Sequence, residues 1–307
     1  MFFGKTANKV SVTPQDIAVL GTGALALYLA DAFQNLGHRV CLLCPPQNAD
    51  EYNATDFVFK DSARLKNPRG TFRFSHELPF RPQVLLLASS VEHQRADLTL
   101  LSPPALTDTT IISFCFPEHG AILPEILKKP VISAFFDGWL TRAKNHIHIY
   151  GHSPKVTFSL NDASGEAAAL TELFEPAGIA AVFLEDAQTN LWNYIGPRLA
   201  YDLLTAVFEQ NVFQLTKTAD GRKAVDTLLA EISSLAAADN AVLPETALLT
   251  KLYEIPSAWT SPLQQSVRAA EPQYFERLNA FVSRQSGSND KRYPFLHELF
   301  HRLYNKY

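Results

Sequence analysis

A short glycine-containing segment near the N-terminus constrains the fold of this chain most strongly. Four apolar residues, Ile17 to Leu20, are followed by Gly21-Thr-Gly23-Ala-Leu-Ala26 and then by a helical pattern that stops at Gly37. A second apolar segment, Arg39 to Cys44, comes directly afterwards. Strand, glycine turn, helix and strand in this order are typical of a dinucleotide-binding βαβ unit.

Each small residue of this turn has a physical role in such a unit. Gly21 would permit the tight turn, Gly23 would let the backbone approach a pyrophosphate, and Ala26 would let the helix lie close to the strand. The anion would bind to free N–H groups at the helix start, where the helix dipole favours negative charge. The alternative is a glycine turn of a doubly wound fold that has lost its ligand.

The rest of the chain shows two sequence patterns, one typical of strands and one typical of helices. Apolar segments at 57–60, 84–88, 110–116, 131–136, 147–150, 155–160 and 180–184 are expected to be strands, and 165–174 is expected to be a helix. Helical periodicity then predicts helices at 186–214, 219–238, 244–251, 262–270, 272–285 and 293–305. The sequence therefore predicts an α/β fold with two domains: a Rossmann-type dinucleotide-binding domain at 1–185 and an all-helical C-terminal domain at 186–307.

Composition excludes several classes of protein. The chain has 307 residues, 47% of them hydrophobic and 19% charged, with a formal net charge of −4. Bulk attraction to nucleic acid or to an anionic membrane is therefore not expected. No apolar segment approaches the roughly 20 residues of a membrane span, and Met1 to Pro14 has no secretory pattern. We expect a cytoplasmic protein with reduced thiols.

Two groups of residues have the spacing of metal ligands. Cys41 and Cys44 form a C-x-x-C, which is also found in zinc and redox sites. They lie in a predicted strand without a second pair, so we favour buried thiols. His146, His148 and His152 lack a nearby carboxylate or cysteine, which favours surface or turn histidines. We predict no metal site.

The layout resembles the ketopantoate reductase family along nearly the whole chain. The segments that carry the resemblance are the opening through Gly37-His-Arg-Val-Cys-Leu-Leu43, the junction Leu191-Trp192 to Leu204-Thr-Ala206, Thr260-Ser-Pro-Leu-Gln264 and Leu278-Asn-Ala-Phe-Val282. Members of the family reduce a 2-keto acid with NADPH. The resemblance therefore implies NADP or NAD as the cofactor, a small-molecule substrate between the domains, and an assembly for which a homodimer is one option.

The chain departs from the family where the catalysis is expected. The family's catalytic lysine falls on Tyr194, and its two asparagines fall on Arg198 and Asp202, while Ser261 is retained. The family's glutamate falls on Gln273 or Tyr274. A tyrosine, with an ordinary pKa of about 10, is a poor proton donor at neutral pH unless its site changes that value. We therefore expect an altered site that does not reduce ketopantoate itself.

The predicted site residues fall into two groups. Tyr194, Arg198 and Asp202 are spaced by four, so they share one helix face, and with Ser261 they form the predicted catalytic group. The predicted cofactor-binding residues follow three expected strands: Gly21, Thr22, Gly23, Ala24, Leu25, Ser89, Ser90, Phe116 and Pro117. His119, in the same segment as the last two, is a further candidate proton donor.

Two questions stay open at this level. Cys44-Pro-Pro-Gln47 offers neither the acid nor the arginine that usually selects between NAD and NADP, although Asp50 and Glu51 in the following loop could fold back. The leading hypothesis is an NAD(P)-dependent oxidoreductase that acts on a small carboxylate-bearing keto or hydroxy compound. The alternative is a non-catalytic descendant that binds a nucleotide or a protein partner.

Overall fold

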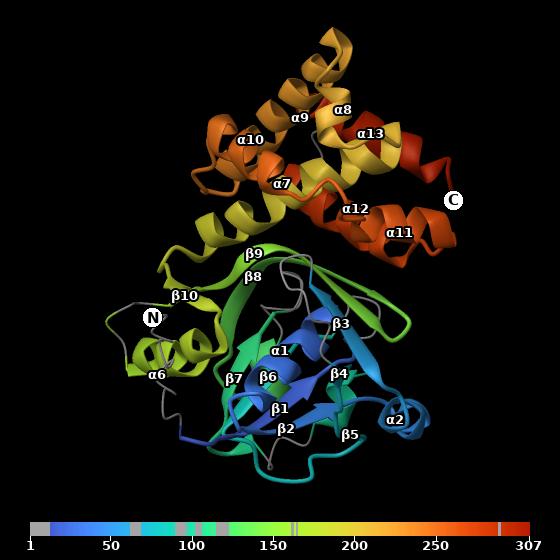
Figure 1. The fold of residues 1–307 in the computed structure, drawn as a ribbon. Coiled ribbons are helices and arrows are strands. Elements are labelled where there is room, and N and C mark those ends of the chain that lie inside the picture. Colours follow the sequence, from blue (N-terminus) through green and yellow to red (C-terminus); the bar gives the residue numbers. More distant parts are fainter. Residues whose placement is uncertain are drawn as a thin grey trace, which may run out of the picture.

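The computed structural model describes residues 13–61, 69–89, 97–101, 106–114, 123–160, 163, 165–287 and 290–307. Within these ranges the chain forms a sheet-containing part and a helical part, which lie one above the other in Figure 1. Of the predicted site residues, Ser90, Phe116 and Pro117 lie outside the described residues, as does His119.

One mixed sheet of ten strands organises the first part, in the order β4-β3-β9-β8-β7-β6-β1-β2-β5, with β10 paired to β9. The bounds of the strands are β1 Asp16–Leu20, β2 Arg39–Leu43, β3 Phe57–Asp61, β4 Arg69–Gly70, β5 Phe74–Ser75, β6 Val84–Leu87, β7 Thr110–Ser113, β8 Ile132–Ala143, β9 His146–Phe158 and β10 Ala180–Phe183. Strands β2, β1, β6 and β7 pair in parallel. Their carboxyl ends therefore meet at one edge, where a doubly wound sheet binds its ligands.

Helices cover the two faces of this parallel core. Helix α1 (Ala24–Gln34) and helix α6 (Gly165–Phe174) pack on one face, where Phe33 contacts Phe174 with ring centroids 5.3 Å apart. The opposite face buries Leu20, Leu85 and Leu87. Because both faces are covered, the strands are continuous apolar runs rather than alternating ones. The shorter elements of this part are α2 (Pro46–Asn53), η1 (Leu98–Leu100), α5 (Leu123–Leu127) and η3 (Glu175–Ala177).

A long hairpin extends the sheet beyond the parallel core. Strand β8 pairs in parallel with β7 only at Ile132 and Ser133, and then pairs antiparallel with β9 up to Ala143. A register shift at Asp137 and Trp139 marks a bulge, which bends a strand locally. In Figure 1 the hairpin passes above α1 toward the helical part, so its outer half can contact both parts of the chain.

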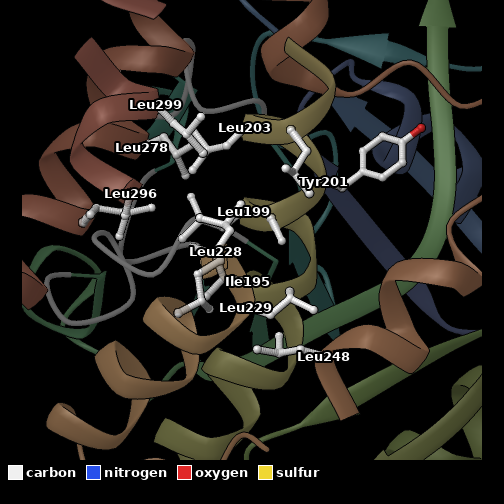
Figure 2. Close-up of a cluster of buried hydrophobic side chains, with 14 of the residues drawn as sticks. Ile195, Leu199, Tyr201, Leu203, Leu228, Leu229, Leu248, Leu278, Leu296 and Leu299 are labelled. Carbon is white, nitrogen blue, oxygen red and sulfur yellow. The ribbon is translucent and has the colours of Figure 1, made fainter. Parts of the chain in front are cut away.

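The helical part is built around α7. Its helices are α7 Ala187–Phe208, α8 Val212–Leu215, α9 Ala219–Ala238, α10 Glu245–Glu254, α11 Pro262–Ala269, α12 Gln273–Ser286 and α13 Pro294–Tyr304, with η4 at Asp290–Arg292. Figure 2 shows Ile195, Leu199 and Leu203 of α7 among leucines of α9, α10, α12 and α13. Burial of these side chains contributes about 1.5–3 kcal/mol each, and it fixes the orientation of the polar face of α7.

The structure confirms the predicted fold class and corrects several elements. The two predicted strands 147–150 and 155–160 are one strand, because β8 pairs with both halves of β9 across the bulge. The expected loop that contains Asp50 and Glu51 is helix α2, with a proline in its first turn. The expected helix 186–214 is two helices, since the chain turns into a left-handed conformation at Glu209, where φ is 56°. The division into domains at residue 185 stays a prediction.

None of the helices that the structure describes combines the length and the apolar character that a bilayer crossing requires.

Candidate functional site

The glycine turn lies at the carboxyl end of β1, where a doubly wound sheet would bind a dinucleotide. Gly21 has a φ of +124°, and a Cβ atom there would lie 2.8 Å from the Ala88 carbonyl oxygen and from the backbone of Ser89. Only glycine fits this backbone conformation beside a neighbouring strand end. A Cβ atom at Gly23, by contrast, would meet nothing within 4 Å. The first glycine is therefore required by the fold, and the second faces open space.

The start of α1 offers free donors beside this space. Gly23 is the N-cap residue of α1 and has no side chain that could accept from the first turn. The first N–H groups of an α-helix have no partner within the helix, so those around Ala24 and Leu25 can bind an anion. Thr22, Gly23, Ala24 and Leu25 are all half-buried. The residues of the turn therefore fit a pyrophosphate.

The hairpin holds the turn in place from the other side. The Arg142 guanidinium of β8 donates a hydrogen bond to the carbonyl oxygen of Thr22, and it lies 5.1 Å from the ring centroid of Tyr52 on α2. Ser89, a predicted cofactor residue, is buried, and its hydroxyl donates to the Leu20 carbonyl oxygen at 3.3 Å. The structure thus brings Ser89 to the turn, where its hydroxyl has a partner within the protein.

Three of the predicted catalytic residues, Tyr194, Arg198 and Asp202, lie on the face of α7 that is not used by the leucine core, and the fourth, Ser261, is the N-cap residue of α11. Asp202 is 1% exposed and accepts a hydrogen bond from the hydroxyl of Tyr274 on α12, with 3.0 Å between the oxygens. Ser261 is fully buried and caps α11 through its hydroxyl, which accepts from the N–H of Gln264 at 3.2 Å. Asp202, Ser261 and Tyr274 therefore form one polar group between three helices, in which Asp202 and Ser261 are buried and Tyr274 is half-buried.

Burial dominates the electrostatics of this group. Desolvation raises the pKa of Asp202 to about 6, and the Ser261 hydroxyl, the Tyr274 hydroxyl and the charge of Arg198 limit the rise. Oδ1 of Asp202 has no partner of good hydrogen-bond geometry within the described part of the chain. Burial and the neighbouring Asp202 raise the pKa of Tyr274 well above its ordinary value. Asp202 can consequently exchange a proton near neutral pH.

Arg198 does not have the free guanidinium that the sequence led us to expect. Its two terminal nitrogens donate to the carbonyl oxygens of Tyr194 and Phe136, at 3.2 and 3.1 Å. The guanidinium carbon lies 3.9 Å from the ring centroid of Tyr194 and 4.5 Å from that of Trp139. The side chain therefore fastens α7 to β8, and two aromatic rings lie against it.

The aromatic residues at the junction have different roles. The ring of Tyr194 lies tilted against that of Phe135 on β8, with centroids 5.3 Å apart, and the rings of Trp139 and Trp259 have centroids 4.8 Å apart. These contacts join the two parts of the chain. Trp192 is instead fully buried in the helical core, and its indole N–H donates to Asp239 at 2.8 Å. The sequence could not separate these roles, because an aromatic residue at a junction can pack in either place.

The metal-like patterns have a simple explanation in the structure. Cys41 and Cys44 are buried free thiols, and burial raises the pKa of each to about 11. His146 and His148 lie on β9 with ring centroids 6.5 Å apart. In the ranges that the structure covers, no three histidine, cysteine or acidic side chains come together in a way that could hold a metal ion.

Comparison with solved structures identifies the architecture. A ketopantoate reductase from Ralstonia eutropha superposes with a TM-score of 0.80 and 17% identity, over 94% of this chain and 97% of that one. The chain has the ketopantoate reductase fold. D-mandelate dehydrogenase, solved with NADH and anilino(oxo)acetate, has a TM-score of 0.77 and 15% identity over 94% and 97% of the two chains. A ketopantoate reductase from Methylococcus capsulatus has 21% identity and a TM-score of 0.72, over 94% and 96%.

Sequence comparison gives no closer assignment. No family model matches this chain, and no curated protein matches it. The low identities within the ketopantoate reductase fold fit a divergent member.

Proposed function

We propose that the chain is an NAD(P)-dependent oxidoreductase that acts on a small keto or hydroxy acid between its two parts. The observation that carries this proposal is the glycine turn. Gly21 is sterically required, whereas the position of Gly23 has no steric demand from the protein and borders an uncapped helix start. A turn kept open at the point where a pyrophosphate would lie fits a bound dinucleotide.

A bound nicotinamide cofactor would supply the hydride. The residues of this chain would bind, orient and protonate the substrate. The Tyr194 hydroxyl is the candidate proton donor to the developing alkoxide. Asp202 lies two helical turns further along α7, and we assign it, with Ser261 and Tyr274, to the same proposed site. Predicted cofactor residues Ser90, Phe116 and Pro117 remain part of the proposal.

The architecture and the neighbours support this choice of chemistry. D-mandelate dehydrogenase of the same fold was solved with NADH and a carboxylate-bearing oxo compound, and others of the neighbours are ketopantoate reductases. We propose NADP or NAD as the cofactor and a homodimer as the assembly, since a ketopantoate reductase of this fold from Staphylococcus aureus is dimeric.

Binding to a glycine variant tests the proposal directly. Gly23→Val directs a branched side chain into the open space and should remove NADPH and NADH binding, measured by calorimetry, without unfolding the chain. Gly165→Val is the matched control, because a Cβ atom there also meets nothing within 4 Å, and it should bind like the unmodified protein. If the unmodified protein binds none of NAD⁺, NADH, NADP⁺ and NADPH at millimolar concentration, the proposal fails.

A second function is favoured by one observation. By the resemblance, the family's lysine falls on Tyr194, whose ring lies against the Arg198 guanidinium. A chain that binds the nucleotide without turning over a substrate would keep this arrangement. Nucleotide binding together with no oxidation of NADPH across a panel of 2-oxo acids would favour this non-catalytic alternative.

A further inference from the structure

A cavity of about 200 Å³ lies between the two parts of the chain, next to the predicted site. Its polar lining consists chiefly of Asp137, Lys155, Asn193, Tyr194 and Lys251, which come from β8, β9, α7 and α10. Phe135 is part of its apolar wall. Tyr194 is thus shared between this cavity and the predicted catalytic group.

Positive charge exceeds negative charge around this cavity. The Asp137 carboxylate lies 3.2 Å from the Lys155 ammonium and 4.0 Å from the Arg198 guanidinium. Lys251 is a third cation that interacts with the Asp137 carboxylate. Burial, together with the charges of Lys155 and Arg198, lowers the pKa of Lys251. Among the residues described, Glu254 is a further acid that acts on Lys251, and it is exposed. Two cations, Lys155 and Lys251, therefore line the cavity with one carboxylate, Asp137, which also lies near Arg198.

Lys251 has donors available for a ligand. Its ammonium donates to the carbonyl oxygen of Asn193 at 2.9 Å, which is one of the three hydrogen bonds that an ammonium can donate. This bond ties α10 to α7 and holds the charge at the wall of the cavity. An ammonium that is partly removed from water gains more from a bound anion than an exposed one does.

Arg198 is less suited to this role, because it is not among the residues that line the cavity. It donates to two backbone carbonyl oxygens, and its guanidinium carbon lies close to the rings of Tyr194 and Trp139. A carboxylate that entered between the two parts would meet Lys251 and Lys155 with unused donors.

We propose that Lys251 and Lys155 bind the carboxylate of a small organic acid in this cavity, with the apolar wall at Phe135 facing the rest of the ligand. This inference rests on the proposed function, because it names the group that would recognise a keto or hydroxy acid. Asp137 occupies the same cations in the absence of a ligand, so it competes with the bound carboxylate.

The test uses the full chain and a pair of probes that differ in charge. Binding of 2-oxobutanoate, 2-oxobutanamide and inorganic phosphate is measured by calorimetry at constant ionic strength, since salt screens such charges. We expect 2-oxobutanoate to bind at least tenfold more tightly than the uncharged amide and than phosphate. Equal binding of the amide would overturn the proposal, and tighter binding of phosphate would overturn the assignment to an organic acid.

Variants of the three charged residues sharpen the test. Lys251→Gln keeps a donor for the Asn193 carbonyl oxygen but loses the charge, so 2-oxobutanoate should bind about tenfold more weakly, and Lys251→Arg should restore most of the affinity. Asp137→Asn should tighten binding severalfold because it removes the competing carboxylate. Lys223→Met, at an exposed position on α9, is the control and should bind like the unmodified protein.

The same preparations separate the two proposals. If NADPH binds and Lys251→Gln leaves 2-oxobutanoate affinity unchanged, the carboxylate site is wrong and the proposed function survives. If Lys251→Gln loses the carboxylate while no nicotinamide nucleotide binds to the unmodified protein, the site stands and the oxidoreductase proposal is wrong.

Discussion

The hydroxyl of Tyr274 lies 3.0 Å from Oδ2 of Asp202, and the two residues are 72 positions apart in the sequence. Asp202 is on α7 and Tyr274 is in the first turn of α12, so this contact forms only when the helical part is complete. It engages Asp202, a member of the predicted catalytic group. Its energetics give the first prediction.

Asp202→Asn should make stability less dependent on pH. Because the pKa of Asp202 is about 6 in the folded chain and 3.8 as its ordinary value, the folded state binds this proton more tightly than the unfolded state. The stabilisation of the folded state by this bound proton is therefore fully present below about pH 3.8 and is lost as the pH rises through about 6. The difference corresponds to about 3 kcal/mol.

Urea unfolding of both proteins at pH 4 and pH 7.5 measures this effect. The neutral amide can still accept from Tyr274, so the variant should gain on the unmodified protein by about 2–3 kcal/mol between the two pH values. If the variant and the unmodified protein differ in unfolding free energy by the same amount at both pH values, burial does not disfavour the ionised form of Asp202.

Arg198→Met should weaken the junction between the two parts of the chain. The variant loses charge-assisted hydrogen bonds to the Phe136 and Tyr194 carbonyl oxygens and the contact with two rings. Together these interactions predict a loss of about 2–4 kcal/mol of folding free energy, measured by urea unfolding.

Carboxylate binding by the same variant distinguishes two roles of Arg198. We expect the affinity for 2-oxobutanoate to stay within about threefold of the unmodified protein. A loss of more than tenfold, with the fold intact by circular dichroism, would return Arg198 to the role of a carboxylate clamp that the sequence suggested.

The sequence predicted the elements that rest on local pattern. Helix α9 has the predicted bounds of 219 and 238, because its periodicity is uninterrupted and Thr218 caps its start. Helix α6 also has its predicted bounds, 165 and 174. The β1-turn-α1 unit was predicted for the same reason, since its signal lies within ten residues.

Elements that depend on distant partners were missed. Gly151 and Pro154 interrupt the pattern of β9, and the strand continues through them only because β8 supports it on both sides of the bulge. The role of Arg142 at the glycine turn depends on a contact across 120 positions. At the site, the sequence left Gln273 and Tyr274 as alternatives, and the structure directs Tyr274 to Asp202. Lys251 belongs to no sequence motif, and its position beside Tyr194 follows from the packing of α10 on α7.

Cys41 and Cys44 should resist alkylation in the native protein. Both thiols are buried and their pKa values are raised to about 11, so about one thiol in a thousand is a thiolate at pH 8. Iodoacetamide at pH 8 should label the two residues only after unfolding in guanidinium chloride, with peptide mass spectrometry reading each position separately. Rapid native labelling of either residue, or a disulfide between them, would revive the redox interpretation of the C-x-x-C.

Lys306→Met should destabilise the C-terminal end of α7, the central helix of the helical part. The ammonium of Lys306 donates to the carbonyl oxygens of Ala206 and Val207, at 3.0 and 3.4 Å, and pairs with Glu209 at 2.7 Å. The last carbonyl oxygens of a helix have no partner within it, and a cation there also interacts favourably with the negative end of the helix dipole. We expect a loss of about 1 kcal/mol in urea unfolding, and hydrogen exchange should increase at α7 rather than at α9. Lys217→Met, at an exposed position after α8, is the control. If the two variants unfold at the same urea concentration, Lys306 does not stabilise α7.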